Sequence, residues 1–153
     1  MQDQNFFVYQ RQSLQPLLLW GIGSSLAGTA MLLVPGYVRH FGLQALSWGA
    51  IDLLLAAAGR RQALLKAEAL VQGELDEAQV QAEAERFQQI LAFNAGLDLV
   101  YIAVGLAVAA TWPERDDRRG LGHGVAVQGA FLLAFDAWLA REVGQRFLGS
   151  TNL

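Results

Sequence analysis

The hydrophobic residues of this chain form four long stretches, separated by clusters of charged residues. Apart from three isolated aspartates, the Asp, Glu, Lys and Arg residues gather at 3–11, 39, 60–86, 114–119 and 141–146. A bilayer core about 30 Å thick needs roughly 20 mainly apolar residues in a helix, and all four stretches meet that length. The pattern therefore predicts an all-α protein with four transmembrane helices.

The clusters of charge also fix the expected bounds of each element. Whole helices are expected at about 12–37, 42–72, 76–112 and 120–147. Their membrane-spanning parts are expected at about 14–37, 42–59, 88–111 and 120–141. We therefore expect residues 1–153 to form a single integral membrane domain, a four-helix bundle in up-down-up-down order.

A soluble helical bundle is the main alternative to a membrane domain. Each of its helices would need a polar outer face. The segment Leu99–Thr111 reads LVYIAVGLAVAAT and has no charge anywhere around the helix. The sequence therefore favours the membrane domain.

Residues 60–87 are expected to form a helical hairpin that extends both neighbouring spans beyond the membrane. The segment is rich in helix-forming residues and contains no proline, and Gly73 is its one expected break. The first arm is basic and the second acidic, so Arg61 or Lys66 should pair with Glu83 or Glu85. Such a hairpin is either a solvated connection between two spans or a docking element for a cytoplasmic partner.

Composition excludes several classes of protein. Hydrophobic residues make up 54% of the chain and charged residues 16%, below the roughly 25% of a soluble domain. The absence of cysteine excludes disulfides, thiolate metal sites and a cysteine nucleophile. The net charge of −3 and the lack of a basic patch argue against nucleic-acid binding.

The distribution of Lys and Arg predicts the orientation of the spans. The N-terminal segment, the hairpin and the C-terminal tail carry seven of these residues, whereas the other side carries four. Cytoplasmic loops carry an excess of Lys and Arg, so both termini should be cytoplasmic. The first apolar stretch lacks the basic start and the cleavage site of a secretory signal, and is expected to remain as a span.

Three aspartates stand alone inside three of the spans. Asp52, Asp98 and Asp136 have no Lys or Arg in any span to neutralise them. An ionised Asp at the centre of a membrane helix costs about 2.5–3.5 kcal/mol on insertion scales. Each aspartate should therefore face the bundle interior and be protonated, accept hydrogen bonds or bind a cation.

Other polar residues share a face with these aspartates. Gln44, Trp48 and Asp52 stand four residues apart and so lie on one side of a helix. Similar spacings add residues from the other spans. The candidate ligand- or ion-binding residues are Ser24, Gln44, Trp48, Asp52, Asn94, Asp98, Tyr101, Gln128 and Asp136.

Asp52 and Asp98 are expected to share one buried site. They lie about 12 and 18 Å from the basic boundary at 1.5 Å per residue, so their depths are similar. At least one should be protonated at neutral pH. Hydrogen bonds to the pair are expected from Ser24, Asn94, Tyr101 and Gln128.

Two motifs carry a resemblance to a known group of proteins. Asn94–Tyr101 reads NAGLDLVY and Gln128–Asp136 reads QGAFLLAFD. These motifs resemble those of an uncharacterised group of small four-span bacterial membrane proteins with no assigned function. The resemblance is best in the last two spans and poor in the first. It implies a four-helix membrane bundle, placed in the bacterial inner membrane, and supplies no activity.

Two functions from different classes remain open. The aspartates could provide a proton- or cation-linked site for transport or for binding a polar solute, since intramembrane acids are commonly functional. Alternatively, the polar cluster holds helices together in a structural or accessory membrane subunit, whose hairpin docks a partner. The expected partners are the lipid bilayer, further copies of the chain and a larger membrane complex.

Enzyme activity has no support in the sequence. No Gly-rich phosphate loop, HExxH, GxSxG or paired glutamate is present. No cofactor or metal is expected, because His40 and His123 fall in or beside outer loops rather than in a ligand cluster.

Overall fold

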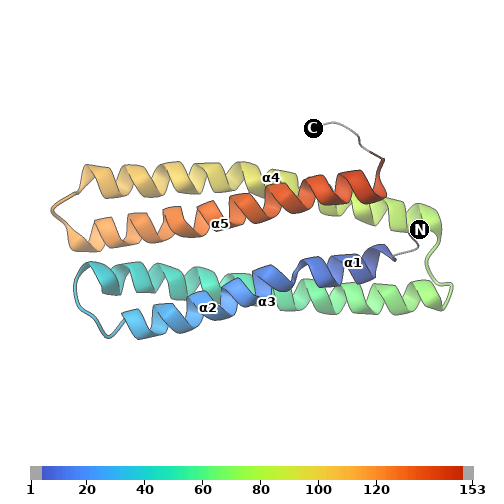
Figure 1. The fold of residues 1–153 in the computed structure, drawn as a ribbon, viewed down its shortest axis with the longest axis horizontal. Coiled ribbons are helices and arrows are strands. Elements are labelled where there is room, and N and C mark those ends of the chain that lie inside the picture. The colour runs from blue at the N-terminus through green and yellow to red at the C-terminus, as the bar shows by residue number, and fades with distance from the viewer. Residues whose placement is uncertain (1–4, 150–153) are drawn as a thin grey trace.

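The protein is a bundle of helices. The computed structural model describes residues 5–149. Within them the helices are α1 (Phe6–Ser13), α2 (Gln15–Met31), α3 (Tyr37–Val71), α4 (Glu77–Thr111) and α5 (Asp116–Phe147) (Figure 1). These residues contain no strand, and the prediction of an all-helical chain is confirmed.

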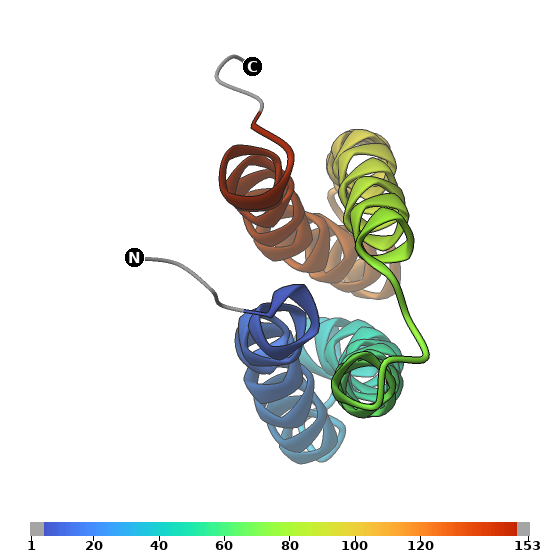
Figure 2. The same cartoon turned by 90° about the vertical axis from the view of Figure 1, so that its right-hand side faces the viewer.

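Helices α2 to α5 run alternately in opposite directions and pack as two pairs. Helix α2 lies along α3, and α4 lies along α5. The end view in Figure 2 shows the two pairs side by side. Contacts between α3 and α5 join them.

Glycines allow the backbones within each pair to touch. A Cβ added at Gly105 of α4 would lie 2.5 Å from the carbonyl oxygen of Gly122 in α5. A Cβ added at Gly21 of α2 would lie 2.6 Å from the backbone nitrogen of Leu53 in α3. These distances leave no room for a side chain, so the packing of both pairs depends on small residues.

Local sequence explains where α3 ends and α4 begins. Gly73 has a positive φ of 76°, a conformation that side chains disfavour, and it lies two residues after Val71, the last residue of α3. The Asp76 side chain then accepts a hydrogen bond from the Gln79 amide, while the Gln79 side chain accepts one from the Asp76 amide. This capping box starts α4. The predicted break at Gly73 is confirmed.

The prediction of a single helix over 12–37 is wrong at both ends. The chain forms a separate helix, α1, which ends at Ser13. Leu14 separates it from α2, which has Pro16 in its first turn. Proline has no N–H to donate to the preceding turn, which favours a break there. At the other end α2 stops at Met31, ahead of Pro35 and a positive-φ Gly36.

Three of the helices are long and apolar enough to cross a membrane. They are α3, α4 and α5, judged by length and composition within the described residues. Helix α2 has 17 residues and is not among them. The structure therefore supports a membrane protein with three such helices, rather than the four that the sequence predicted.

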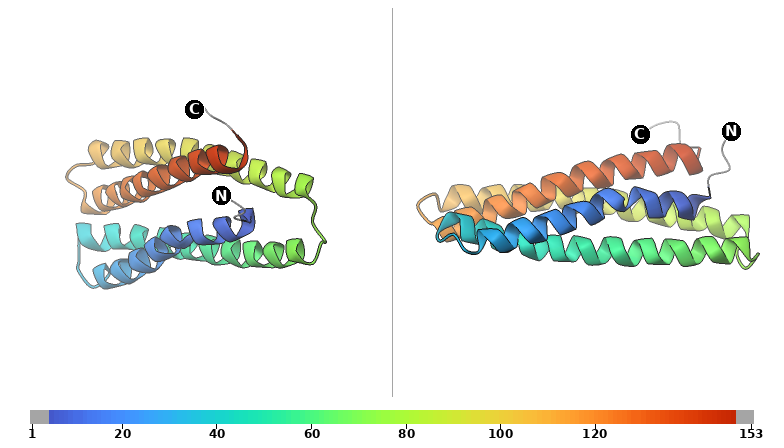
Figure 3. Two further views of the ribbon diagram at one scale, coloured as in Figure 1. Left: turned by 45° about the vertical axis from the view of Figure 1, so that its right-hand side comes forward. Right: turned by 60° about the horizontal axis from the view of Figure 1, so that its bottom comes forward.

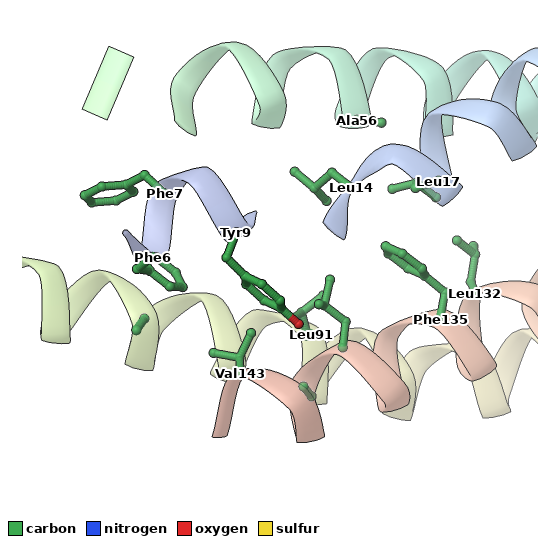
Figure 4. Close-up of a cluster of buried hydrophobic side chains, with 13 residues drawn as sticks. Phe6, Phe7, Tyr9, Leu14, Leu17, Ala56, Leu91, Leu132, Phe135 and Val143 are labelled. Carbon is green, nitrogen blue, oxygen red and sulfur yellow. The ribbon is translucent and has the colours of Figure 1, made fainter. Parts of the chain in front are cut away.

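Helix α1 lies between α3 and the α4–α5 pair, as both views of Figure 3 show. Phe6 and Phe7 are fully or almost fully buried. The Phe6 ring centroid lies 5.2 Å from that of Phe147 and 6.2 Å from that of Phe87. Figure 4 shows this hydrophobic cluster continuing along the interior to Leu132 and Phe135.

The C-terminal part of α3 and the N-terminal part of α4, which extend beyond the predicted spans, form the expected ion pair. Lys66 Nζ of α3 lies 2.6 Å from Glu83 Oε1 of α4, which confirms this pairing. Leu70 and Val80 pack against the buried cluster. Leu65 and Val71 remain exposed. Phe6 and Phe7 of α1 belong to the same buried cluster.

Candidate functional site

Three buried carboxyl groups enter the interior from three different helices. Asp52 of α3, Asp98 of α4 and Asp136 of α5 are 2%, 3% and 6% exposed. The expectation that all three face the interior is confirmed.

Asp52 and Asp98 each have a buried carboxyl oxygen, Oδ2, without a hydrogen-bond partner among the described residues. An unsatisfied buried polar atom costs about 1–3 kcal/mol. The structure thus contains carboxyl oxygens that a proton or a ligand would stabilise.

Gln128 and Ser24 bond elsewhere. The Trp20 indole N–H donates to Gln128 Oε1 at 2.7 Å, and Gln128 Nε2 donates to Ser24 Oγ at 3.4 Å. These bonds link α2 to α5 and occupy both polar atoms of the amide. The expectation that Gln128 and Ser24 hydrogen-bond the carboxyls is therefore wrong.

Trp48 and Tyr101 meet each other between α3 and α4. Their ring centroids lie 5.1 Å apart in an edge-to-face contact, and both residues are half-buried. Tyr101 has no hydrogen bond to either carboxyl in the described residues, contrary to expectation. Gln44, also half-buried, packs its Cβ against Gly124 of α5.

A crevice runs from the ion pair of Lys66 and Glu83 to Asp136, one of the three buried carboxyls. It has a volume of about 310 Å³ and is bordered by Lys66 and Glu83 at one end and by Asn94 and Asp136 at the other. The eleven residues from Glu83 to Asn94 correspond to about 16 Å along α4. Apolar side chains form its walls: Leu14, Leu17, Leu55, Phe87, Ile90, Leu91 and Phe135.

Asn94 and Asp136 are the predicted site residues that line this crevice. No hydrogen bond joins Asn94 to Asp52 or Asp98 in the described part of the chain. Of the nine candidate residues, Asn94 and Asp136 line the crevice, whereas Asp52 and Asp98 are buried and do not line it. The other five make contacts between helices: Ser24, Gln44, Trp48, Tyr101 and Gln128.

Comparison with known families identifies the family of this chain, and the activity of that family is unknown. The model of a family of unknown function, DUF6992, matches residues 16–137. The chain belongs to the DUF6992 family. No curated protein and no solved structure matches it.

The segment matched to DUF6992 runs from the start of α2 to the residue after Asp136. All nine candidate residues lie within it. Helix α1 and the last turns of α5 lie outside. The family match agrees with the resemblance to an uncharacterised group.

The acids of this DUF6992 protein do not converge as ligands of one metal ion. Within residues 5–149 no three His, Asp or Glu side chains are placed to hold one.

The spacing of Trp20, four residues before Ser24, predicts that both face the bundle interior, but it does not predict the hydrogen bond from Trp20 to Gln128. The Trp20 ring also stacks on Phe131, with centroids 4.0 Å apart. The crevice had no such signal, because it arises from the separation of α3 and α4 in three dimensions.

Proposed function

We propose that this DUF6992 protein crosses the membrane four times and binds a proton at Asp52, Asp98 and Asp136. The observation that carries the proposal is the burial of three carboxyls, from three different helices, without a basic residue in their spans. Removing three charges from water and placing them together is strongly unfavourable. The site therefore holds at least one proton at neutral pH and releases or takes up protons as a unit.

Helix α2 is the proposed fourth span. Its 17 residues correspond to about 26 Å, close to the thickness of the bilayer core. No charged residue occurs from Gln12 to Val38, so the turn after α2 can extend the apolar length. Leu33 in this turn is 87% exposed, which suits contact with lipid.

The proposed orientation follows from the fold and from the positive charges. Helix α1, the α3–α4 turn and the end of α5 lie at one end of the bundle (Figure 1). This end carries seven of the eleven Lys and Arg residues. We assign it to the cytoplasm, with the protein in the inner membrane of a bacterium.

The crevice gives the site access from this cytoplasmic end. It reaches Asp136, whereas close backbone contacts such as Gly105 with Gly122 fill the other half of the α4–α5 pair. A proton bound from one side and released to the other would serve transport. Four helices are few for a transport pathway, so we propose that copies of the chain associate.

Infrared difference spectroscopy of the reconstituted protein tests the proton site. A protonated carboxyl has a C=O absorption that a carboxylate lacks. We expect this band at neutral pH and expect Asp98→Asn to diminish it while the helical content stays the same. Asp116→Asn, at an exposed acid of the opposite end, is the matched control. A spectrum without the band at neutral pH would refute the proposal.

A structural role in a membrane complex is the second candidate. It is favoured by the apolar residues that α3 exposes on its cytoplasmic arm: Leu64 at 37%, Leu65 at 55% and Val71 at 84%. Exposed apolar patches outside the membrane commonly mark interaction surfaces. Leu65→Asp should then release a partner in native electrophoresis of solubilised membranes without altering the infrared band.

A further inference from the structure

We infer that the crevice binds a small organic cation, with its charged group at Asp136 and Asn94 and its apolar body between α3 and α4. The inference rests on the proposed function, because the cation and the proton would compete for the same carboxyls. It goes beyond the proposed function by naming the chemical class of ligand that the crevice would bind.

The first observation is the environment of Asp136. Its side chain borders the crevice, is more than nine-tenths buried and accepts no hydrogen bond in the described residues. Asp52 and Asp98 do not line the crevice, and each has a carboxyl oxygen that is wholly buried. Asp136 is therefore the carboxyl that a molecule entering the crevice meets first, and Asn94 adds an amide oxygen beside it.

The second observation is the sign of the charges that face Asp136. Asp52 from α3 and Asp98 from α4 reinforce its negative potential. At the mouth, Lys66 is paired with Glu83 at 2.6 Å, and Arg86 is the remaining cation. Helices α1 and α2 contribute the uncharged Gln10, Leu14 and Leu17. The deep end therefore attracts a cation and repels an anion.

The third observation is the chemistry of the walls. Leu55, Ile90 and Leu91 offer apolar surface that an organic body can cover and a hydrated metal ion cannot. The Phe87 and Phe135 rings also border the crevice, and aromatic faces attract organic ammonium groups. A volume of about 310 Å³ is at the lower end of the range for ligand pockets, which indicates a small ligand.

Charge balance makes the binding pH-dependent. A monovalent cation that binds a protonated site displaces one proton to solvent, so the net charge of the site is unchanged. The apparent Kd should then fall about tenfold for each unit of rising pH, until the site is already deprotonated. At low pH the bound proton competes with the cation and weakens its binding.

Titration calorimetry of the full chain in lipid nanodiscs tests the inference with benzyltrimethylammonium. This probe keeps its charge at every pH, so any pH dependence belongs to the protein. Neopentylbenzene has the same shape without the charge, and phenylmethanesulfonate has the opposite charge. We expect the cation to bind at least tenfold more tightly than the neutral isostere, and the anion not to bind.

Variants separate the parts of the site. Asp136→Asn should weaken binding of the cation more than tenfold, whereas Asp116→Asn should leave it unchanged. Leu55→Trp fills the crevice from its wall and keeps all three carboxyls. It should abolish binding of the cation and retain the protonated-carboxyl band, which shows that the protein is still folded.

The two proposals fail in different ways. A protonated-carboxyl band without cation binding at any pH would overturn the cation site and leave the proton site standing. Absence of the band would overturn the proton site itself. Equal affinity for the cation and the neutral isostere, or a Kd that does not change with pH, would also overturn the cation site.

Discussion

The hydrogen bonds of Gln128 lead to a prediction about stability. Gln128→Leu should lower the free energy of unfolding by about 0.6–2 kcal/mol, because Trp20 and Ser24 both lose a partner. Denaturation in mixed micelles, followed by circular dichroism, measures the change. Gln89→Leu, at an exposed position of α4, is the control and should have little effect. An equal loss in both variants would contradict the assigned role of Gln128.

Helical spacing predicted the direction of the site residues but not their partners. The spacing of Asp52 with Gln44 and Trp48 predicted an inward face, and Asp52, Asp98 and Asp136 are all buried. Spacing fixes only the direction of a side chain from its own helix axis. Whether Gln128 meets Asp98 or Trp20 depends on how neighbouring helices are rotated and separated. That information lies in tertiary packing, and there the expected hydrogen bonds were wrong.

Tyr9 leads to a prediction about alkaline pH. Burial of its hydroxyl raises the pKa of Tyr9, the Glu142 carboxylate raises it further, and Arg146 opposes the change. The pKa is higher in the folded than in the unfolded chain. The neutral phenol therefore contributes stability that is complete below about pH 10 and lost as the pH rises through the folded value.

Tyr9→Phe removes this dependence. The hydroxyl has no hydrogen-bond partner in the described residues, so the variant should be at least as stable as the wild type at pH 8. Above about pH 10 its Tm should exceed that of the wild type by a growing margin. Thermal melts across this range measure the difference. Curves that stay parallel would show that the pKa of Tyr9 is the same in the folded and the unfolded chain, which contradicts the prediction.

Whole elements were predicted well where hydrophobicity and turn signals agree. The observed α3 and α4 end within a few residues of the expected bounds, because Gly73 and the Asp76–Gln79 box stop and start a helix locally. Helix α1 escaped prediction because its eight residues mix aromatic and polar side chains and fall within a charged cluster. Its position depends on Phe6 and Phe7 entering a cluster made by distant elements.

The glycine contacts between α4 and α5 lead to a prediction at this scale. Gly105→Ala places a methyl group 2.5 Å from the Gly122 carbonyl oxygen, so the helices must separate. We expect a loss of about 1–3 kcal/mol of stability. The same denaturation assay measures it.

Gly96→Ala is the matched control on the same helix, since nothing lies within 4 Å of an added Cβ there. This variant should be neutral or slightly stabilising, because alanine favours a helix over glycine. The prediction fails if Gly96→Ala destabilises the protein as much as Gly105→Ala does.

The architecture of the whole molecule was predicted in outline. Four antiparallel helices after the short α1 agree with the expected bundle, although α2 is shorter than the expected first span. Alternating apolar stretches and charged loops contain this information. The separation of α3 from α4, which creates the crevice, could not be read from the sequence, because it depends on α1 filling part of the space.

Topology can be tested on the intact chain. Reporters fused at Met1 and Leu153, both outside the described residues, should report the cytoplasmic side. Helix α1 and the end of α5 lie at the end of the bundle that carries seven of the eleven Lys and Arg residues. A reporter inserted at Glu114, between α4 and α5, should report the opposite side. Opposite results from the two termini would exclude an even number of spans.

The unbroken length of α3 has a mechanical consequence. The helix continues without interruption from Tyr37 to Val71, and nineteen residues, or about 29 Å, separate Asp52 from its far end. If α3 tilts about Asp52, its far end therefore moves farther than the residues near Asp52 do. A tilt of α3 that followed occupancy of the buried carboxyls would thus move its far end most, without any ligand leaving the crevice.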